Sequence, residues 1–309
     1  MFSRSRVGAV DGPALVRGLA LRLHRPLTRF APAPTGFLHL GHVVNAIFVW
    51  GLARALDGRV LLRIEDHDRQ RSRVEYEAAL LDDLDWLGFT PDVFRTDAFR
   101  GGHCEGRQSQ RDAAYRAALE PLVGRGLVYG CDCSRKQMDA PVYSGRCRDR
   151  RLPLGEGIGW RVRVDLREEC FDDGLLGRQC QSPSEQCGDV LIRDRLGNWT
   201  YQWAATADDM LQEIDLIVRG QDLLDSTGRQ IYLARLLGRG TPAVFAHHPL
   251  IMKSATQKLS KSDRDTGVRD LRDSGWTRSQ VLGQAAFLAG LQPSSRATDA
   301  VAVVSFFAE

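Results

Sequence analysis

The sequence predicts an α/β fold whose core is a parallel sheet. An apolar run over residues 60–66 ends in acidic residues and is typical of a buried strand, and residues 74–87 have the apolar spacing of an amphipathic helix. A second apolar run over 214–220 is followed by a helical pattern over 230–237. Because strands alternate with helices, we expect helices on the faces of the sheet and ligands beyond the carboxyl ends of its strands.

The remaining segments extend this pattern. The sequence predicts a helix beginning near Gly41, a helix over 111–127, strands alternating across 160–200, a helix over 203–211 and a strand over 249–252.

Composition indicates a cytoplasmic globular protein. The chain has 309 residues, of which 43% are hydrophobic and 26% charged, enough for two or three domains. Its net charge of +3 does not by itself indicate a nucleic-acid binder, and the arginine clusters are interpreted as solvated faces. Charge or glycine breaks every apolar stretch well short of a membrane span, and the basic N-terminal segment lacks the apolar region of an export signal.

Residues 30–42 predict a phosphate-binding corner. Pro32 and Pro34 favour extended backbone before them, and helical periodicity resumes only after Gly41. The amides and positive dipole end of the new helix would then lie beside His39 and His42, whose ring nitrogens can donate to a phosphate. The alternative is an ordinary strand-to-helix connection with surface histidines.

The seven cysteines predict a metal site rather than a disulfide framework. Their number is odd and no export signal precedes them. Cys131, Cys133 and Cys147 lie in a short loop-rich segment that suits a tetrahedral zinc. Spacing leaves the fourth ligand open among Tyr143, His103 and a water molecule. The other four cysteines are expected to be isolated thiols: Cys104, Cys170, Cys180 and Cys187.

A second phosphate-directed segment is Lys258-Leu259-Ser260-Lys261-Ser262, near the end of the α/β pattern. Two lysines on a loop after a strand can hold a triphosphate as mobile point charges. A Lys/Ser loop taken alone is usually solvated surface. Its occurrence together with the histidine corner, with a cysteine segment between them, favours a nucleotide site.

These phrases resemble the signature motifs of class I aminoacyl-tRNA synthetases. The two signatures are His39-Leu40-Gly41-His42 and Lys258-Leu259-Ser260-Lys261-Ser262. The segments 29–36, 63–66 and 218–224 are similar to those of the glutamyl branch, and the resemblance covers roughly residues 27–265. It implies a Rossmann-type nucleotide-binding core, split by an inserted zinc-containing α+β subdomain and followed by a short helical C-terminal segment.

Glutamyl-tRNA synthetases continue past the lysine motif into an anticodon-binding region, whereas only 264–309 follow it here. The chain therefore resembles a truncated subfamily of the glutamyl branch that attaches glutamate to the queuosine base of tRNA(Asp). The resemblance implies zinc ligands at Cys131, Cys133, Tyr143 and Cys147. Two departures, Leu259 and Ala33, leave the implied chemistry intact.

The resemblance also implies the site residues. It assigns catalytic roles to His39, His42, Lys258 and Lys261, and binding of ATP, with Mg²⁺ as counter-ion, to His39, Gly41, His42 and Lys261. It assigns glutamate binding to Arg29, Phe30, Ala31, Pro32, Ala33, Glu65, Tyr201 and Arg219.

The expected organisation is a leader over 1–26, two halves of the catalytic domain over 27–120 and 201–265, the zinc subdomain over 121–200 and a helical end over 266–309. The expected partners are ATP, L-glutamate and queuosine-containing tRNA(Asp), with the protein acting as a monomer and without a membrane. Two alternatives remain: a truncated enzyme that charges the tRNA 3′ end, and a non-catalytic zinc-containing RNA-binding paralogue.

Overall fold

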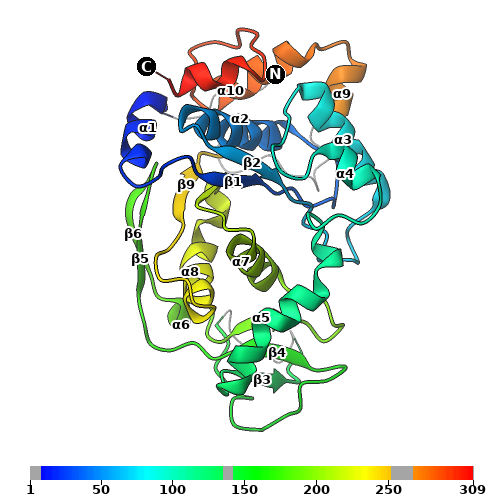
Figure 1. Cartoon of the computed structure of the whole chain (residues 1–309), viewed down its shortest axis with the longest axis vertical. Coiled ribbons are helices and arrows are strands. Elements are labelled where there is room, and N and C mark those ends of the chain that lie inside the picture. The colour runs from blue at the N-terminus through cyan, green and yellow to red at the C-terminus, as the bar shows by residue number, and fades with distance from the viewer. Residues whose placement is uncertain (1–7, 135–141, 252–266, 309) are drawn as a thin grey trace.

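The computed structural model describes residues 8–134, 142–251 and 267–308. Its centre is a six-stranded sheet of order β2-β1-β8-β9-β5-β6 (Figure 1). Five neighbouring strands run parallel, and β6 pairs antiparallel with β5. The strands are β1 (Leu27–Phe30), β2 (Arg59–Leu62), β5 (Glu169–Asp173), β6 (Gly177–Gln181), β8 (Leu216–Gly220) and β9 (Val244–His248). The predicted mainly parallel α/β architecture is confirmed.

Helices cover both faces of this sheet (Figure 1). On one face Val60 and Leu216 pack in the cluster that contains α2 (Leu40–Ala55), with α10 (Arg278–Leu288) behind it. On the other face Leu61 and Ile217 pack with residues of α8 (Thr227–Leu236), beside which lies α7 (Tyr201–Leu211). Alternate strand residues therefore bury opposite faces, as the period of two requires.

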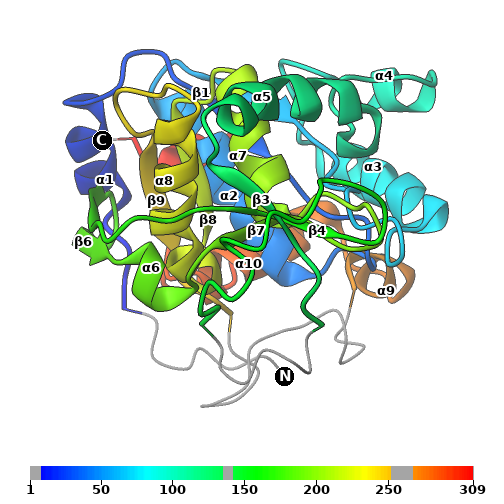
Figure 2. The ribbon, with the colours of Figure 1, turned by 90° about the horizontal axis from the view of Figure 1, so that it is seen from below.

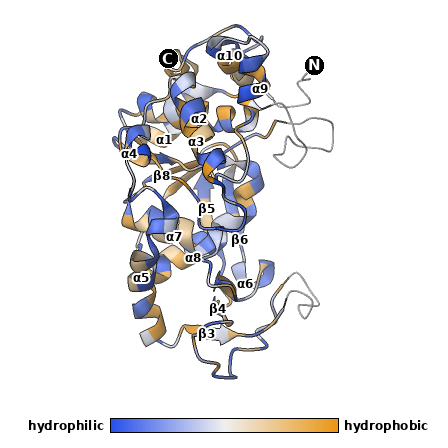
Figure 3. Ribbon diagram, turned by 90° about the vertical axis from the view of Figure 1, so that its right-hand side faces the viewer, coloured by the Kyte–Doolittle hydropathy of each residue, from blue (hydrophilic) through white to orange (hydrophobic). Residues whose placement is uncertain are grey.

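A smaller antiparallel sheet lies at the far end of the long axis from α10 (Figures 1 and 3). It has the order β3-β4-β7, with β3 (Val128–Cys131), β4 (Gly159–Val162) and β7 (Val190–Arg193). Its core joins apolar residues of α5 (Asp112–Gly124) to those of α7. Because α7 belongs to this cluster and also packs against α8, it couples the small sheet to the rest of the molecule.

The remaining elements border these layers. They are α3 (Val74–Leu87), α4 (Thr96–Arg100), α6 (Pro183–Gln186), α9 (Val268–Asp273) and the 3-10 turns η1 (Gln108–Gln110), η3 (Gln221–Ser226) and η5 (Ala302–Phe306).

Part of the predicted leader is an ordered helix, α1 (Gly12–Ala20). Its Leu15 and Leu19 are buried in the main core, and Arg22 donates from Nη1 to the carbonyl oxygen of Asp172 at 2.7 Å. Figures 1 and 2 place α1 beside the β5–β6 hairpin. These contacts make α1 a cover for that edge of the sheet.

The strand expected over 249–252 is wrong. The strand at this point is β9, Val244–His248, which ends immediately before Pro249. Proline has no N–H and cannot donate to the ladder, so the apolar residues after it leave the sheet. Met252 lies outside the described residues.

The expectation of isolated thiols at Cys170 and Cys180 is also wrong. They form a disulfide across the β5–β6 hairpin, where they are directly opposite each other with 4.1 Å between their Cα atoms. Sequence spacing could not show this pairing, because it depends on the hairpin register. The hairpin lies within the segment assigned to the inserted subdomain, 121–200, but β5 pairs with β9, so the hairpin is part of the six-stranded sheet.

Among the described helices, none has the length and apolar character needed to cross a membrane.

Asp83 is a buried carboxyl on α3 with consequences for stability. Its side chain is 1% exposed, and its Oδ2 has no hydrogen-bond partner among the described residues. Burial raises the pKa of Asp83 to about 7, although the Arg269 and Arg272 charges oppose the shift. The folded-state pKa thus exceeds the unfolded value, so the folded state holds this proton more tightly and stability falls as pH rises from about 4 to about 7.

We expect Asp83→Asn to remove this pH dependence. The variant should gain stability over the parent protein between pH 5 and pH 8, by up to ~4 kcal/mol for a shift of about three pKa units. Urea unfolding at both pH values measures the difference. Asp82→Asn is the matched control, because Asp82 is 66% exposed and pairs with Arg100 at the surface. A pH slope that survives in Asp83→Asn would contradict the prediction.

Candidate active site

A cavity of about 390 Å³ opens at the carboxyl ends of the parallel strands. It lies where β1, β8 and β9 finish, the edge at which an α/β sheet binds ligands. The structure brings together here every described residue that the sequence assigned to ATP or glutamate: Arg29, Phe30, Ala31, Pro32, Ala33, His39, Gly41, His42, Glu65, Tyr201 and Arg219.

The two histidines form the N-terminus of α2. His39 is the N-cap, and its Nδ1 accepts a hydrogen bond from the Gly41 amide at 3.0 Å. The Nδ1 of His42 accepts from the His39 amide at 3.1 Å, which completes a reciprocal capping box. The ring centroids lie 4.1 Å apart. Because both Nδ1 atoms accept, each neutral ring carries its proton on Nε2.

This geometry revises the expected phosphate contacts. The sequence indicated that main-chain amides at the start of the helix face the ligand, but the imidazoles accept from two of them, those of His39 and Gly41. Donors directed at an anion therefore come from the rings at Nε2, supported by the helix dipole.

Arg29 and Asp209 connect β1 to α7. The Arg29 Nε donates to Asp209 Oδ1 at 3.0 Å, and both side chains are buried. Arg63 Nη1 donates to the same oxygen at 2.8 Å. Although burial opposes its ionisation, the Arg29 and Arg63 guanidiniums hold the pKa of Asp209 below its usual range. One carboxylate thus fixes two arginines.

Arg63 extends this network to Glu65. Its Nη2 donates to Glu65 Oε1 at 3.1 Å, and its side chain is fully buried. Burial disfavours the Arg63 charge, yet the surrounding carboxylates raise the pKa of this guanidinium above its usual value. An arginine behind Glu65 therefore fixes the position of its carboxyl group at the cavity wall.

Arg219, at the end of β8, has a different environment. It is 3% exposed and donates to four neutral acceptors: Tyr201 Oη, His247 Nε2, Thr227 Oγ1 and Gln230 Oε1. Burial lowers the pKa of Arg219, and the nearby Arg29 charge acts in the same direction. The cavity therefore holds two arginines, of which Arg29 is paired with a carboxylate and Arg219 is not paired with any carboxylate that the structure describes.

Lys258 and Lys261 lie outside the described residues, which stop at Ile251 and resume at Gly267. The residues on either side of this gap lie close to the cavity and to His39 at the N-terminus of α2. Ile251 lines the cavity, Gly267 forms a bridge with His39, and the Val268 amide donates to the Leu38 carbonyl at 2.8 Å.

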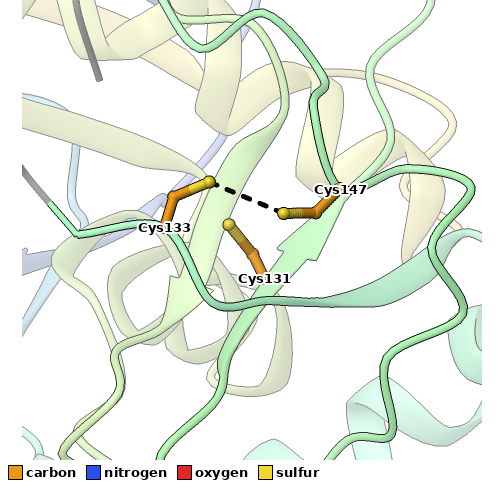
Figure 4. Close-up of side chains that lie close together, drawn as sticks. All are labelled: Cys131, Cys133 and Cys147. Carbon is orange, nitrogen blue, oxygen red and sulfur yellow. Dashed lines mark hydrogen bonds between the residues drawn. The ribbon is translucent and has the colours of Figure 1, made fainter. Parts of the chain in front are cut away.

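The cysteine segment brings three thiols together, as Figure 4 shows. The sulfur atoms of Cys131, Cys133 and Cys147 all lie within 4.8 Å of one another, and those of Cys133 and Cys147 are 3.5 Å apart. Three thiolates on one tetrahedral zinc would be separated by about 3.8 Å at the usual bond length. The Tyr143 hydroxyl lies 3.5 Å from Cys131 Sγ and accepts from the Cys147 amide at 2.9 Å. The group thus fits a tetrahedral cation, and His103 is not part of the cluster.

Sequence reasoning missed several residues that hold this site in place. Arg63 lies two residues before Glu65 in the segment that follows β2, and Asp208 and Asp209 lie on the buried face of α7. His247, at the end of β9, contacts Arg219. Acidic residues within the apolar stripe of α7 were the one available sequence signal, because buried carboxylates require cationic partners.

The fold and cavity define an α/β protein with a ligand-sized cavity at the carboxyl ends of its strands. The family model for class I tRNA synthetases (E and Q), catalytic domain, matches residues 27–146 and 153–298. The chain belongs to this family, and the predicted resemblance is confirmed.

Relatives and solved structures agree with this membership. The chain is 42% identical over 238 residues to the glutamyl-Q tRNA(Asp) synthetase of Pseudomonas paraeruginosa, covering 76% of this chain and 77% of that protein. It is 38% identical to the protein of the same name from Rhodobacter capsulatus, over 82% of this chain and 98% of that one. The glutamate-tRNA synthetase structure from Elizabethkingia anophelis aligns with a TM-score of 0.72 at 26% identity, over 85% of this chain and 61% of that one. This chain thus spans less than two thirds of that synthetase.

The His39 N-cap requires a residue without a Cβ at position 41. A Cβ at this position would lie 2.8 Å from Cε1 of the His39 ring, so Gly41→Ala must displace the imidazole. We expect this variant to lose the His39 cap, which offsets the helix propensity gained with alanine, about 1 kcal/mol in each direction. Thermal unfolding measures stability, and ring ¹⁵N shifts report the His39 tautomer.

The matched control is Gly18→Ala in α1, where a Cβ has no atom within 4 Å. That variant should gain stability and leave the His39 signals unchanged. Equal stabilisation by both substitutions, with His39 unperturbed, would refute the cap.

Proposed function

We propose that this protein activates L-glutamate with ATP and transfers the glutamyl group to the queuosine base of tRNA(Asp). One observation carries the proposal: a single cavity at the strand ends holds two buried arginines on one side and the His39–His42 pair on the other. Relatives from several bacteria that are 37–42% identical are named glutamyl-Q tRNA(Asp) synthetase, which supports this acceptor.

Glutamate fits the arginine side of the cavity. It has two carboxylates and one ammonium, and the wall offers Arg29, Arg219 and the Glu65 carboxylate. Burial strengthens charged hydrogen bonds, because little water screens them. Arg63 holds one Glu65 oxygen, so the other is the oxygen for the ammonium. Tyr201, which accepts from Arg219, would donate its hydroxyl to the same substrate.

ATP fits the histidine side. His39 and His42 would donate from Nε2 to phosphate oxygens, and Gly41 allows their close approach to the helix end. Lys258 and Lys261 would stabilise charge on the departing pyrophosphate, since the residues that flank their segment are at this corner. Mg²⁺ would accompany ATP. Attack of the glutamate carboxylate on the α-phosphate then depends on positioning and charge neutralisation by these groups.

The cysteine cluster suits a structural zinc held by Cys131, Cys133, Cys147 and Tyr143. Bound there, zinc would add cross-links to a small unit that has few apolar residues of its own. The cluster lies beside β3, in the part of the molecule that the three-stranded sheet forms.

A labelling assay tests the proposed reaction. With ATP and labelled glutamate, we expect label on tRNA(Asp) that carries queuosine and none on the same tRNA without it. Label on tRNA(Glu) would instead favour charging of the 3′ end, a second candidate that one relative supports. This relative, glutamate–tRNA ligase 2 of Syntrophus aciditrophicus, is 37% identical over 85% of this chain and 57% of its own length. Absence of label on every tRNA, with no glutamyl-adenylate formed, would refute both.

Zinc binding has its own test. We expect the purified protein to contain about one zinc per chain and Cys147→Ser to lose most of it, because three thiolates and one tyrosine oxygen leave no spare ligand. Metal analysis by mass spectrometry measures the content. Cys187→Ser is the control, since Cys187 is a free thiol outside the cluster. Equal zinc in both variants would contradict the assignment.

A further inference from the structure

Arg219 differs from Arg29, the other cavity arginine, and from Arg63, which lies behind Glu65, in how its charge is balanced. Arg29 and Arg63 both contact the Asp209 carboxylate, at 3.0 and 2.8 Å. Arg219 is equally buried, yet its partners in the described part of the chain are neutral oxygen and nitrogen atoms. A buried cation without a carboxylate partner is costly for the fold. This unfavourable free energy is offset when an anionic substrate binds and supplies the missing negative charge.

The contact with His247 fixes the direction of the guanidinium. Arg219 Nε donates to His247 Nε2 at 3.0 Å. An arginine can only donate, so this Nε2 accepts, and the proton of the neutral imidazole is on Nδ1. Burial lowers the pKa of His247 and the Arg219 charge acts in the same direction, although the hydrogen bond to Asp173 opposes the shift.

Asp173 completes the arrangement from β5. Its Oδ2 lies 2.6 Å from His247 Nδ1, and both side chains are fully buried. The carboxylate also accepts from the Leu175 and Leu176 amides at 2.9 and 3.0 Å, so its position is fixed by its own turn. Asp173 thus selects the Nδ1–H tautomer, which leaves Nε2 able to accept from Arg219.

We propose that His247, held by Asp173, is a positioning residue that orients Arg219 toward a substrate carboxylate without neutralising it. The imidazole keeps the Asp173 charge one ring away from the guanidinium. Direct contact with a carboxylate would orient Arg219 equally well, but it would weaken the attraction for an incoming anion. This inference rests on the assignment of Arg219 to glutamate in the proposed function.

Two substitutions of His247 test the roles of its two ring nitrogens separately. His247→Gln places an amide oxygen near the position of Nε2, so an acceptor for Arg219 remains. His247→Asn places an amide near the position of Nδ1, so a donor for Asp173 remains and the acceptor for Arg219 is lost. Glutamate-dependent ATP–pyrophosphate exchange, measured with tRNA(Asp) present, gives kcat and the KM values for glutamate and ATP.

We expect His247→Asn to raise the glutamate KM roughly tenfold or more, the effect of losing a hydrogen bond to a charged group. Its ATP KM should stay within about twofold of the parent value, and His247→Gln should retain most of the glutamate affinity. A parent-like His247→Asn with an impaired His247→Gln would overturn the proposal, because the ring would then serve only to satisfy Asp173. Equal values in the two variants would overturn it as well.

A measurement on the unmodified protein covers the case in which neither variant folds. Ring ¹⁵N spectra at neutral pH should show His247 protonated at Nδ1 and unprotonated at Nε2. A proton on Nε2 would overturn the proposal whatever the variants do. If the parent protein supports no glutamate-dependent exchange, the proposed function itself fails, and this measurement still decides the arrangement of the ring.

Discussion

The Asp209 carboxylate, buried between two guanidiniums, is the interaction on which the rest of the site depends. It lies on α7 and receives hydrogen bonds from Arg29 at the end of β1 and from Arg63 just beyond β2. Because burying the two guanidiniums without this carboxylate would be costly, the position of α7 and the cavity wall are determined together. The same helix begins at Tyr201, which also lines the cavity, so the arginine side of the cavity and the small sheet share one support.

The cavity combines paired and unpaired buried charges. Arg29 is in direct contact with the Asp209 carboxylate, whereas the direct partners of Arg219 among the described residues are neutral groups. The His39 and His42 rings accept from the helix amides at Nδ1, so the N–H group of each neutral ring is on Nε2. The protein therefore holds its donors in place before a ligand arrives, which lowers the cost of reorganisation during reaction.

Much of the fold and of the candidate site could be predicted from the sequence. Strand and helix periodicity predicted the parallel sheet and α3, and the two proline residues before Gly36 marked the corner at which α2 begins. The spacing of Cys131 and Cys133 predicted the thiol cluster, because neighbours on a short loop must remain close. The Cys170–Cys180 pairing and the end of β9 were not predicted, since they depend on hairpin register and on the one missing N–H of Pro249.

The sequence by itself determined the family, the order of the elements and the residue types gathered at the strand ends, because these follow from local periodicity and short motifs. Only the tertiary structure decided how each charge is balanced. Asp173 and His247 are 74 residues apart, and Arg29 and Asp209 are 180 apart, so each pairing exists only after the sheet has assembled. Coulombic and hydrogen-bond energies depend on distance in space, and a sequence pattern does not contain that distance.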